Sequence, residues 1–329
     1  LFFFGLFASF AIKYVFLISD RMKRLLLLVL WVWVACFTAA SHNYMFKHLE
    51  VKDGLSNNQV NAIYKDSHGF MWFGTASGLN RYDGYDTRIY RSLKDDGNSL
   101  PDSYIEDIQE DATGNLWVRT GAGYAIYNSV SDIFDRNVEG WMWHIGISGN
   151  PSTVYIDSEK IFWIYVAGKG IYCYKPGQEN AVMVAGTDTL LTEMNITDMT
   201  ECSEGILLAF GNGVLACLDR EKLNVKWTFD GIASQWGKKY NQKLSTLFVD
   251  SHERVWMYSV EGMWVYHLPK KSWEVRSVRS DRSNMVRAIS QDKYGNIWIG
   301  RDQDGIEVIG LDGESVRLMN DPNNERTIS

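Results

Sequence analysis

The chain has 329 residues, of which 46% are hydrophobic and 14% aromatic, so it can bury the core of one large domain. Its formal net charge is −7, and no basic run occurs beyond the N-terminal region. This charge balance argues against direct nucleic-acid contact by the segment.

The N-terminal region carries two apolar stretches. The second starts at Met22 with Lys23 and Arg24, continues through an apolar run and ends in small residues at 38–40. This order predicts a secretory signal peptide over residues 22–40, with residues 1–21 as an upstream extension and an exported mature protein. The alternative is an uncleaved membrane anchor, although the run is short for the roughly 20 residues that a span needs.

Six pairs, each an acidic residue followed six positions later by a large apolar residue, recur every 42 to 49 residues along the chain. The fourth pair is Glu201 and Leu207, whereas the other pairs combine Asp with Trp. A unit of this length, rich in Trp, Gly and short alternating segments, predicts an all-β fold, a β-propeller of four-stranded blades. The five pairs are Asp66/Trp72, Asp111/Trp117, Asp157/Trp163, Asp250/Trp256 and Asp292/Trp298.

These recurring residues are predicted to be structural. The Asp should cap the turn between the first two strands through backbone N–H groups, and the Trp should fill the space between neighbouring blades. We expect no catalytic or metal-binding role for them, because they recur where a scaffold repeats. The first repeat predicts strands at 60–65, 70–74, 79–82 and 87–90.

The repeats predict an incomplete propeller domain over residues 44–329. Six blades are expected here and seven in the intact protein, because residues 321–329 resemble the approach to a further repeat. Residues 46–51 are expected to form a lone strand that closes the ring. With a blade missing, the open sheet edges predict a poorly soluble fragment. The repeats lie near residues 60–90, 105–135, 154–184, 196–229, 244–278 and 286–318.

Three stretches of the first repeat resemble the two-component regulator propeller repeats: Asp53-Gly-Leu-Ser56, Gly69-Phe-Met-Trp-Phe-Gly-Thr75 and Gly78-Leu-Asn-Arg-Tyr-Asp-Gly84. The resemblance covers about residues 44–329 and weakens in the third and fourth repeats. It implies the exported sensor part of a bacterial hybrid two-component system, with a second propeller, a membrane helix and a histidine kinase elsewhere in the protein. It also implies that the sensor binds an oligosaccharide and, through a phosphorelay, controls transcription of genes for glycan use.

The connections between consecutive repeats are long and variable, and loops on a rigid scaffold are where binding sites concentrate. Two of them carry aromatic residues that no position of the repeat explains. Because sugar rings stack on aromatic side chains, we expect these loops to bind the ligand; the alternative is that they cover the core or contact the second propeller. The candidate residues are Trp141, Trp143, His144, Trp236, Lys238, Lys239 and Tyr240.

No sequence pattern for a cofactor, a metal or a catalytic group stands out, so none is expected in this segment. Cys173, Cys202 and Cys217 cannot all pair, although a bridge between the last two is conceivable. Two other functions remain open: a secreted stand-alone propeller lyase or glycosidase, and a protein-interaction scaffold. A homodimer is possible for the intact sensor.

Overall fold

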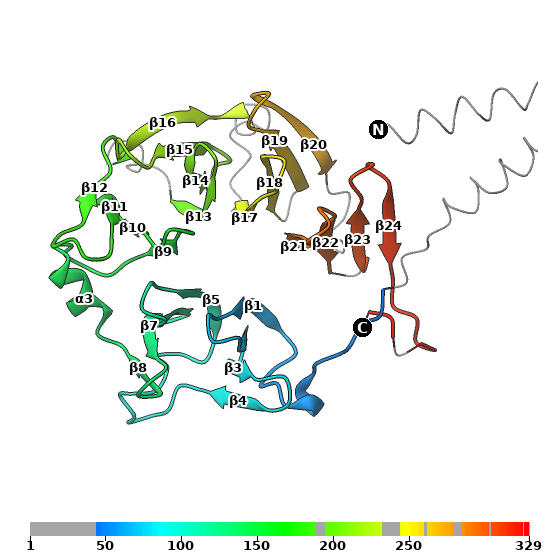
Figure 1. The fold of residues 1–329 in the computed structure, drawn as a ribbon, viewed down its shortest axis with the longest axis horizontal. Coiled ribbons are helices and arrows are strands. Elements are labelled where there is room, and N and C mark those ends of the chain that lie inside the picture. Colours follow the sequence, from blue (N-terminus) through cyan, green and yellow to red (C-terminus); the bar gives the residue numbers. More distant parts are fainter. Residues whose placement is uncertain are drawn as a thin grey trace, which may run out of the picture. The chain divides into compact units, whose positions relative to one another are not determined.

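The computed structural model describes residues 44–187, 195–231, 244–259, 262–278, 285–302, 304–324 and 326–328. The described strands of the unit Lys47–Ser329 form six antiparallel sheets of four strands each, in sequence order within every sheet. Figure 1 shows these six blades around a common centre, with the first strand of each blade innermost. The predicted all-β propeller is confirmed, and each blade coincides with one repeat.

The strands of each blade are called A to D, from the innermost to the outermost. The A strands are β1 (Val60–Lys65), β5 (Ile105–Glu110), β9 (Thr153–Ile156), β13 (Ile196–Cys202), β17 (Leu244–Val249) and β21 (Val286–Gln291). The B strands are β2 (Met71–Thr75), β6 (Leu116–Thr120), β10 (Phe162–Val166), β14 (Gly205–Phe210), β18 (Arg254–Ser259) and β22 (Ile297–Arg301). The C strands are β3 (Gly78–Tyr82), β7 (Gly123–Asn128), β11 (Gly170–Tyr174), β15 (Leu215–Asp219), β19 (Gly262–His267) and β23 (Ile306–Ile309). The D strands are β4 (Thr87–Tyr90), β8 (Ile133–Asp135), β12 (Val182–Met183), β16 (Asn224–Phe229), β20 (Ser272–Val278) and β24 (Ser315–Leu318).

The hydrophobic core is divided among the spaces between consecutive blades. Each of the five buried clusters combines residues of one blade with residues of the next. In the first five blades, the apolar residue of the repeat pair lies in the cluster shared with the following blade, where a large flat side chain fills the wedge between two sheets. These residues, in blade order, are Trp72, Trp117, Trp163, Leu207 and Trp256.

Trp298, in the sixth blade, does not fill a space between blades, and for this residue the prediction was wrong. Its side chain is only partly buried, and it belongs to none of the five buried clusters. The physical reason is that the described strands form no blade after the sixth, so no second sheet lies against this side of β22. Within its own blade, the indole of Trp298 donates to Asp292 at 3.0 Å, as in the other Asp–Trp pairs.

A hydrogen bond within the repeat pair explains its constant interval. One carboxylate oxygen of Asp66 accepts from the backbone N–H of Phe70 at 2.9 Å, which closes the A–B turn. The other oxygen accepts from the indole N–H of Trp72 at 2.7 Å. One buried carboxylate therefore joins the turn to the interblade core, and a different spacing would take the indole out of its reach. The four other Asp–Trp pairs make the same indole bond, at 2.8–3.2 Å.

The fourth blade departs from this arrangement because Leu207 has no indole to offer. The strand register places Cys202 where the other blades have the Asp, and Glu201, predicted for that position, lies one residue before it. The carboxylate of Glu201 accepts from the guanidinium of Arg220 at 2.7 Å. Its carboxylate also accepts from the hydroxyl of Ser158 in the third blade at 2.8 Å. The bond of Glu201 to Ser158 does not depend on the missing Trp, because Glu110 holds the same place in the second blade, where Trp117 is present.

Similar serine bonds join other neighbouring A–B turns. The hydroxyl of Ser67 donates to Glu110 of the second blade at 2.6 Å. Ser203 donates to Glu253 of the fifth blade at 2.7 Å, and the backbone N–H of Ser251 donates to Gln291 of the sixth at 2.9 Å. Glu110 and Gln291 hold the same place in their repeats, one residue after the A-strand residue that pairs with the Trp. Glu253 differs, because it lies in the A–B turn of the fifth blade.

The expected closing strand is not present. Residues 44–50 belong to no strand, and the chain then forms the short 3-10 helix η1 (Val51–Asp53). A strand needs a neighbouring edge for its N–H and C=O groups, and no described strand pairs with this segment. The His48 ring instead lies 2.7 Å from the carbonyl oxygen of Thr327, so the first described residues meet the last.

The predicted signal peptide and upstream extension lie outside the described residues. Among the residues that the structure does describe, no helix is both long enough and apolar enough to cross a membrane.

Candidate ligand-binding face

Backbone hydrogen bonds show which loops share a face of the propeller. The residue before an A strand accepts from the B–C turn of the same blade, as in Tyr104 with Gly121 at 3.0 Å and Asn195 with Gly211 at 3.1 Å. The D-to-A connections therefore end beside the B–C turns. On the opposite face, the C–D turn meets the A–B turn, as in Leu268 with Glu253 at 3.1 Å. The first candidate loop, which connects β8 to β9, and the short uniform turns thus lie on opposite faces.

The first candidate loop contains an unexpected helix, α3 (Val138–His144), which connects β8 to β9. The side chain of Asn137 caps it by accepting from the backbone N–H of Gly140 at 3.1 Å. Val138 and Met142 are buried in the cluster between the second and third blades. No helical pattern emerges from the sequence here, because two turns of helix are too short to produce one.

Helix α3 separates the two tryptophans that were predicted to act together. Trp141 packs against that same interblade cluster, with its ring centroid 4.6 Å from Trp117 and 5.2 Å from Phe162. Trp143 is 70% exposed. Two residues apart on a helix point about 200° from each other, so one must face the core when the other faces water. Trp141 therefore has a packing role, while Trp143 and His144 offer their side chains to solvent.

The second candidate loop, with Trp236, Lys238, Lys239 and Tyr240, lies outside the described residues. The strands that flank it show why the nearby Trp227 is a different case. The Trp227 ring lies 6.0 Å from Tyr266, and its indole donates to Glu204 at 3.0 Å. Trp227 is thus a packing residue of the blade, as its place on a D strand predicted.

Two carboxyl groups on inner strands have raised pKa values. Burial raises the pKa of Asp198 to about 7, and the charge of Asp107 adds to this shift. Burial likewise raises the pKa of Asp107. Both residues follow a register shift in their A strand, and each accepts the N–H of the next residue in the chain at 2.8 Å.

Hydrogen bonds give these two groups a structural explanation. Asp198 also accepts from the backbone N–H of Leu247 in the fifth blade at 2.7 Å. Asp107 accepts from Gln109, whose amide in turn donates to the carbonyl of Val154 in the third blade at 2.9 Å. The inner carboxyls therefore fasten neighbouring blades. The sequence concealed the pair because Asp107 and Asp198 lie 91 positions apart in the chain.

Within the described residues, no group of three or more His, Cys, Asp or Glu side chains could hold a metal ion. The three described cysteines are free, and Cys173 and Cys217 are buried. The thiols of Cys202 and Cys217 share a hydrogen bond, which lowers the pKa of Cys202. The two residues that a bridge would join are thus neighbours in the fourth blade, without being bonded.

Comparison with known proteins finds similarity to a family of propeller repeats in part of the chain. The model of the two component regulator propeller matches residues 54–77, 99–122 and 280–300, which fall in the first, second and sixth blades. Over 62 residues, or 19% of this chain, the sequence is 40% identical to histidine kinase P4 of Formosa agariphila, of which the match covers 4%.

Solved structures share the architecture over most of the chain. The extracellular domain of a putative hybrid two-component system from B. thetaiotaomicron matches with a TM-score of 0.65 and 20% identity, over 87% of this chain and 38% of that one. Virginiamycin B lyase from Staphylococcus aureus matches with a TM-score of 0.55 and 9% identity, over 80% of this chain and 84% of that one. At these identities the structural matches establish the propeller fold alone. The family match falls in three of the six blades, where this chain is similar to the two-component regulator propeller repeats.

Proposed function

We propose that the chain is the ligand-sensing propeller of a bacterial hybrid two-component sensor. The observation that carries this proposal is the match of the two component regulator propeller model to three of the six blades. The chain spans 38% of the extracellular domain of the hybrid system and 4% of the histidine kinase, so the catalytic part of such a protein would lie elsewhere. The segment itself would bind rather than catalyse, and would stand in the periplasm.

The ligand of this sensor would be an oligosaccharide bound on the face of the D-to-A connections. Trp143 supports this assignment, because a 70% exposed indole on a short, capped helix offers a flat apolar surface for a sugar ring. His144 beside it can hydrogen-bond to hydroxyl groups. Trp236, Lys238, Lys239 and Tyr240 remain candidates from the sequence for the same face.

The architecture of the whole protein is tested by reading the DNA on both sides of the encoding segment. We expect one frame that continues into further repeats, a membrane helix and a histidine-kinase domain, with a signal for export at its start. A frame that completes one blade and stops would contradict the sensor.

The binding face is tested by screening oligosaccharides against the chain with isothermal titration calorimetry. Trp143→Ala and Trp236→Ala should each weaken the binding of a ligand found in this way and leave the melting temperature unchanged. Trp227→Ala, a packing residue on β16, is the matched control and should lower the melting temperature instead. Unchanged affinity in both loop variants would remove the ligand from this face.

A secreted lyase is the second candidate, favoured by the fold match to virginiamycin B lyase. A propeller enzyme would need reactive groups that converge on one place. Incubating the chain with polysaccharides and following the release of unsaturated products by their ultraviolet absorbance, which a double bond beside a carboxylate produces, would reveal such activity. We expect none.

A further inference from the structure

A pocket lies between the fifth and sixth blades, on the face opposite the connection that contains α3. Its volume is about 490 Å³, within the range of about 300–1,000 Å³ that is usual for small-molecule sites. It opens between the A–B and C–D turns of the fifth blade and the C–D turn of the sixth. Its lining residues are His252, Arg254, His267, Pro269, Lys270, Arg276, Ile309, Gly310, Leu311 and Gly313.

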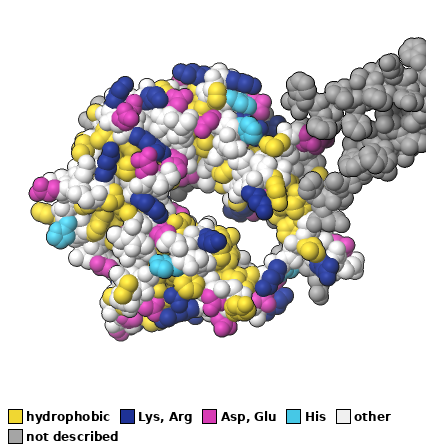
Figure 2. All heavy atoms as spheres, viewed as in Figure 1, with side chains coloured by type: hydrophobic (Ala, Val, Ile, Leu, Met, Phe, Trp, Pro, Cys, Tyr) yellow, Lys and Arg dark blue, Asp and Glu magenta, His cyan; other side chains and the backbone are white. Residues whose placement is uncertain are grey.

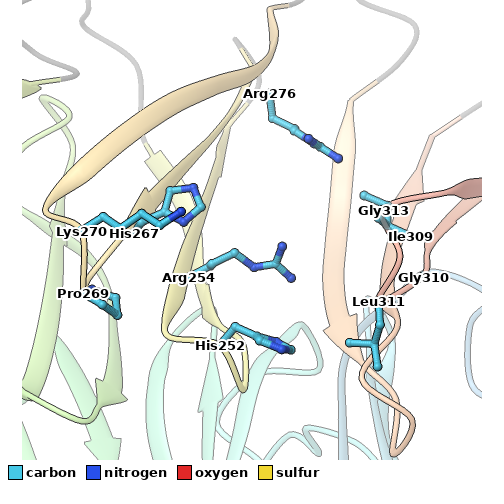
Figure 3. Close-up of a pocket in the computed structure, with 10 residues that line it drawn as sticks. All are labelled: His252, Arg254, His267, Pro269, Lys270, Arg276, Ile309, Gly310, Leu311 and Gly313. Atoms are coloured by element: carbon cyan, nitrogen blue, oxygen red, sulfur yellow. The ribbon is translucent and has the colours of Figure 1, made fainter.

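The two walls of this pocket differ in chemistry. The fifth blade supplies five side chains that carry or can carry positive charge, and no carboxylate belongs to the lining. Figure 3 shows His252, Arg254 and Arg276 pointing from that blade towards the turn at Gly310 and Leu311. The sixth blade supplies an apolar wall, in which Leu311 is 66% exposed. A cationic wall that faces an apolar wall suits a molecule with one anionic side and one apolar side.

Nearby carboxylates leave much of this positive charge uncompensated. Asp250, buried behind the wall, binds the Nε of Arg254 at 2.6 Å and holds the guanidinium beside the Trp256 ring. Glu274 lies 3.9 Å from Arg276, and both side chains are largely exposed, so this pair is weak. Lys270 makes no ion pair with any residue that the structure describes.

We propose that this pocket binds a small organic anion. Its acidic group would be held by Lys270 and Arg276, together with the guanidinium edge of Arg254 that Asp250 does not occupy. Its apolar side would lie against Leu311 on the opposite wall. Suitable ligands carry a carboxylate on a ring or chain that also has an apolar side. A uronic acid is one such molecule. This pocket is distinct from the proposed oligosaccharide face, so a negative result for one proposal leaves the other standing.

Calorimetric titration of the chain with glucuronate and, separately, with glucose tests the charge requirement. The two sugars differ by one carboxylate, so we expect glucuronate to bind and glucose to give no measurable heat. Affinity for glucuronate should fall at least tenfold between about 20 mM and 200 mM salt, because exposed charges are screened. Equal binding of both sugars would overturn the proposal.

Substitutions then locate the site. The double variant Lys270→Gln/Arg276→Gln should lose at least tenfold in affinity for glucuronate. Lys271→Gln is the matched control, since Lys271 is next in the same turn, exposed, and not part of the lining. All three substituted residues are exposed, so the melting temperature should not change. Unaltered affinity in the double variant, or an equal loss in the control, would place the anion elsewhere.

The apolar wall is tested with Leu311→Ser and inorganic sulfate. Sulfate has the charge without an apolar flank, so it should bind more weakly than glucuronate to the unaltered chain. Leu311→Ser should weaken glucuronate severalfold and leave sulfate unchanged. Sulfate binding as tightly as glucuronate, and insensitive to salt or to the Lys270→Gln/Arg276→Gln change, would reveal an adventitious ion only and refute an organic-anion site.

Discussion

At the scale of single residues, the Asp–Trp pair determines how this chain repeats. The sequence showed the interval, the turn-capping role of the Asp and, wherever a further blade follows, the interblade place of the Trp. It did not show that the two side chains bond to each other, because a hydrogen bond between them depends on how the B strand turns back over the A–B turn. That bond gives the Asp a second reason to recur: it satisfies an indole N–H that would otherwise be buried without an acceptor.

Removing the indole donor should be costly. Trp72→Phe keeps an aromatic ring in the wedge but leaves the buried carboxylate of Asp66 without its 2.7 Å bond. We expect the free energy of unfolding, measured by urea denaturation, to fall by about 1.5–3 kcal/mol, the range for bonds to charged groups. Trp143→Phe, at a 70% exposed position, should change it by less than about 0.5 kcal/mol. Similar values for the two variants would show that the indole bond contributes little.

Asp198 should make stability depend on pH in an unusual direction. Its pKa is raised to about 7 in the folded chain, whereas an unfolded Asp titrates near pH 4. The folded chain therefore holds this proton more tightly. The stabilisation is fully present below about pH 4 and is lost as the pH rises through 7.

The measurement compares the chain with its Asp198→Asn variant, whose side chain does not titrate. From pH 5 to pH 8, the free energy of unfolding of the unaltered chain should fall by about 1–3 kcal/mol relative to the variant. The difference between the chain and its variant does not contain the contribution of Asp250, which both proteins share. Hydrogen bonds outweigh burial and lower the pKa of Asp250, so its stabilising effect is lost only at acid pH. A difference that stays constant over this range would contradict the assignment.

At the scale of elements, the strands were predictable and the connections were not. The A and D strands of the first blade begin and end at the predicted residues, because alternation and Asp–Gly turns mark them directly. Helix α3 escaped prediction, and with it the packing role of Trp141. The prediction of the binding site was affected most, because a position in a loop does not show which aromatic side chain faces the core.

The serine bonds between blades offer a test at this scale. Ser67→Ala should lower the free energy of unfolding by about 0.5–1.5 kcal/mol through loss of the 2.6 Å bond to Glu110. A double-mutant cycle with Glu110→Ala should give a coupling energy of about 0.5–3 kcal/mol. Ala112 occupies the same position in the second blade, so Ala112→Ser serves as the control and should be close to neutral. A coupling energy of zero would mean that the two blades are held by packing alone.

At the scale of the whole molecule, the two proposed binding sites lie on opposite faces of the propeller. Figure 2 shows a surface hollowed at its centre, with positive and negative side chains distributed over the blades. The candidate oligosaccharide face and the proposed anion pocket use opposite sides of the disc, so two ligands could bind together. The repeat predicted the disc and its two faces, whereas the pocket depends on side chains from two blades that lie together only after folding.

The local stability of the blades should vary along the chain, because each buried cluster is shared by two neighbouring blades. The fourth blade contributes to two buried clusters, and every residue of β14 is buried. The sixth blade contributes to one, its Trp298 is only partly buried, and its outer strand β24 is largely exposed. In such an array each repeat is stabilised by its own packing and by each interface it forms. The sixth blade should therefore open more readily than the fourth.

Native-state hydrogen exchange followed by mass spectrometry measures this difference. We expect amides of β22 and β23 to exchange at least tenfold faster than those of β14 and β15, which corresponds to about 1.4 kcal/mol or more in the free energy of local opening. Because both sets are B and C strands, hydrogen-bonded on both sides, strand position alone cannot produce the contrast. Glucuronate at saturation should slow exchange in β23 if it bridges the fifth and sixth blades, and leave β14 unaffected. Equal protection of the two blades would mean that the whole unit opens at once. The number of interfaces that a blade forms would then not determine how readily it opens.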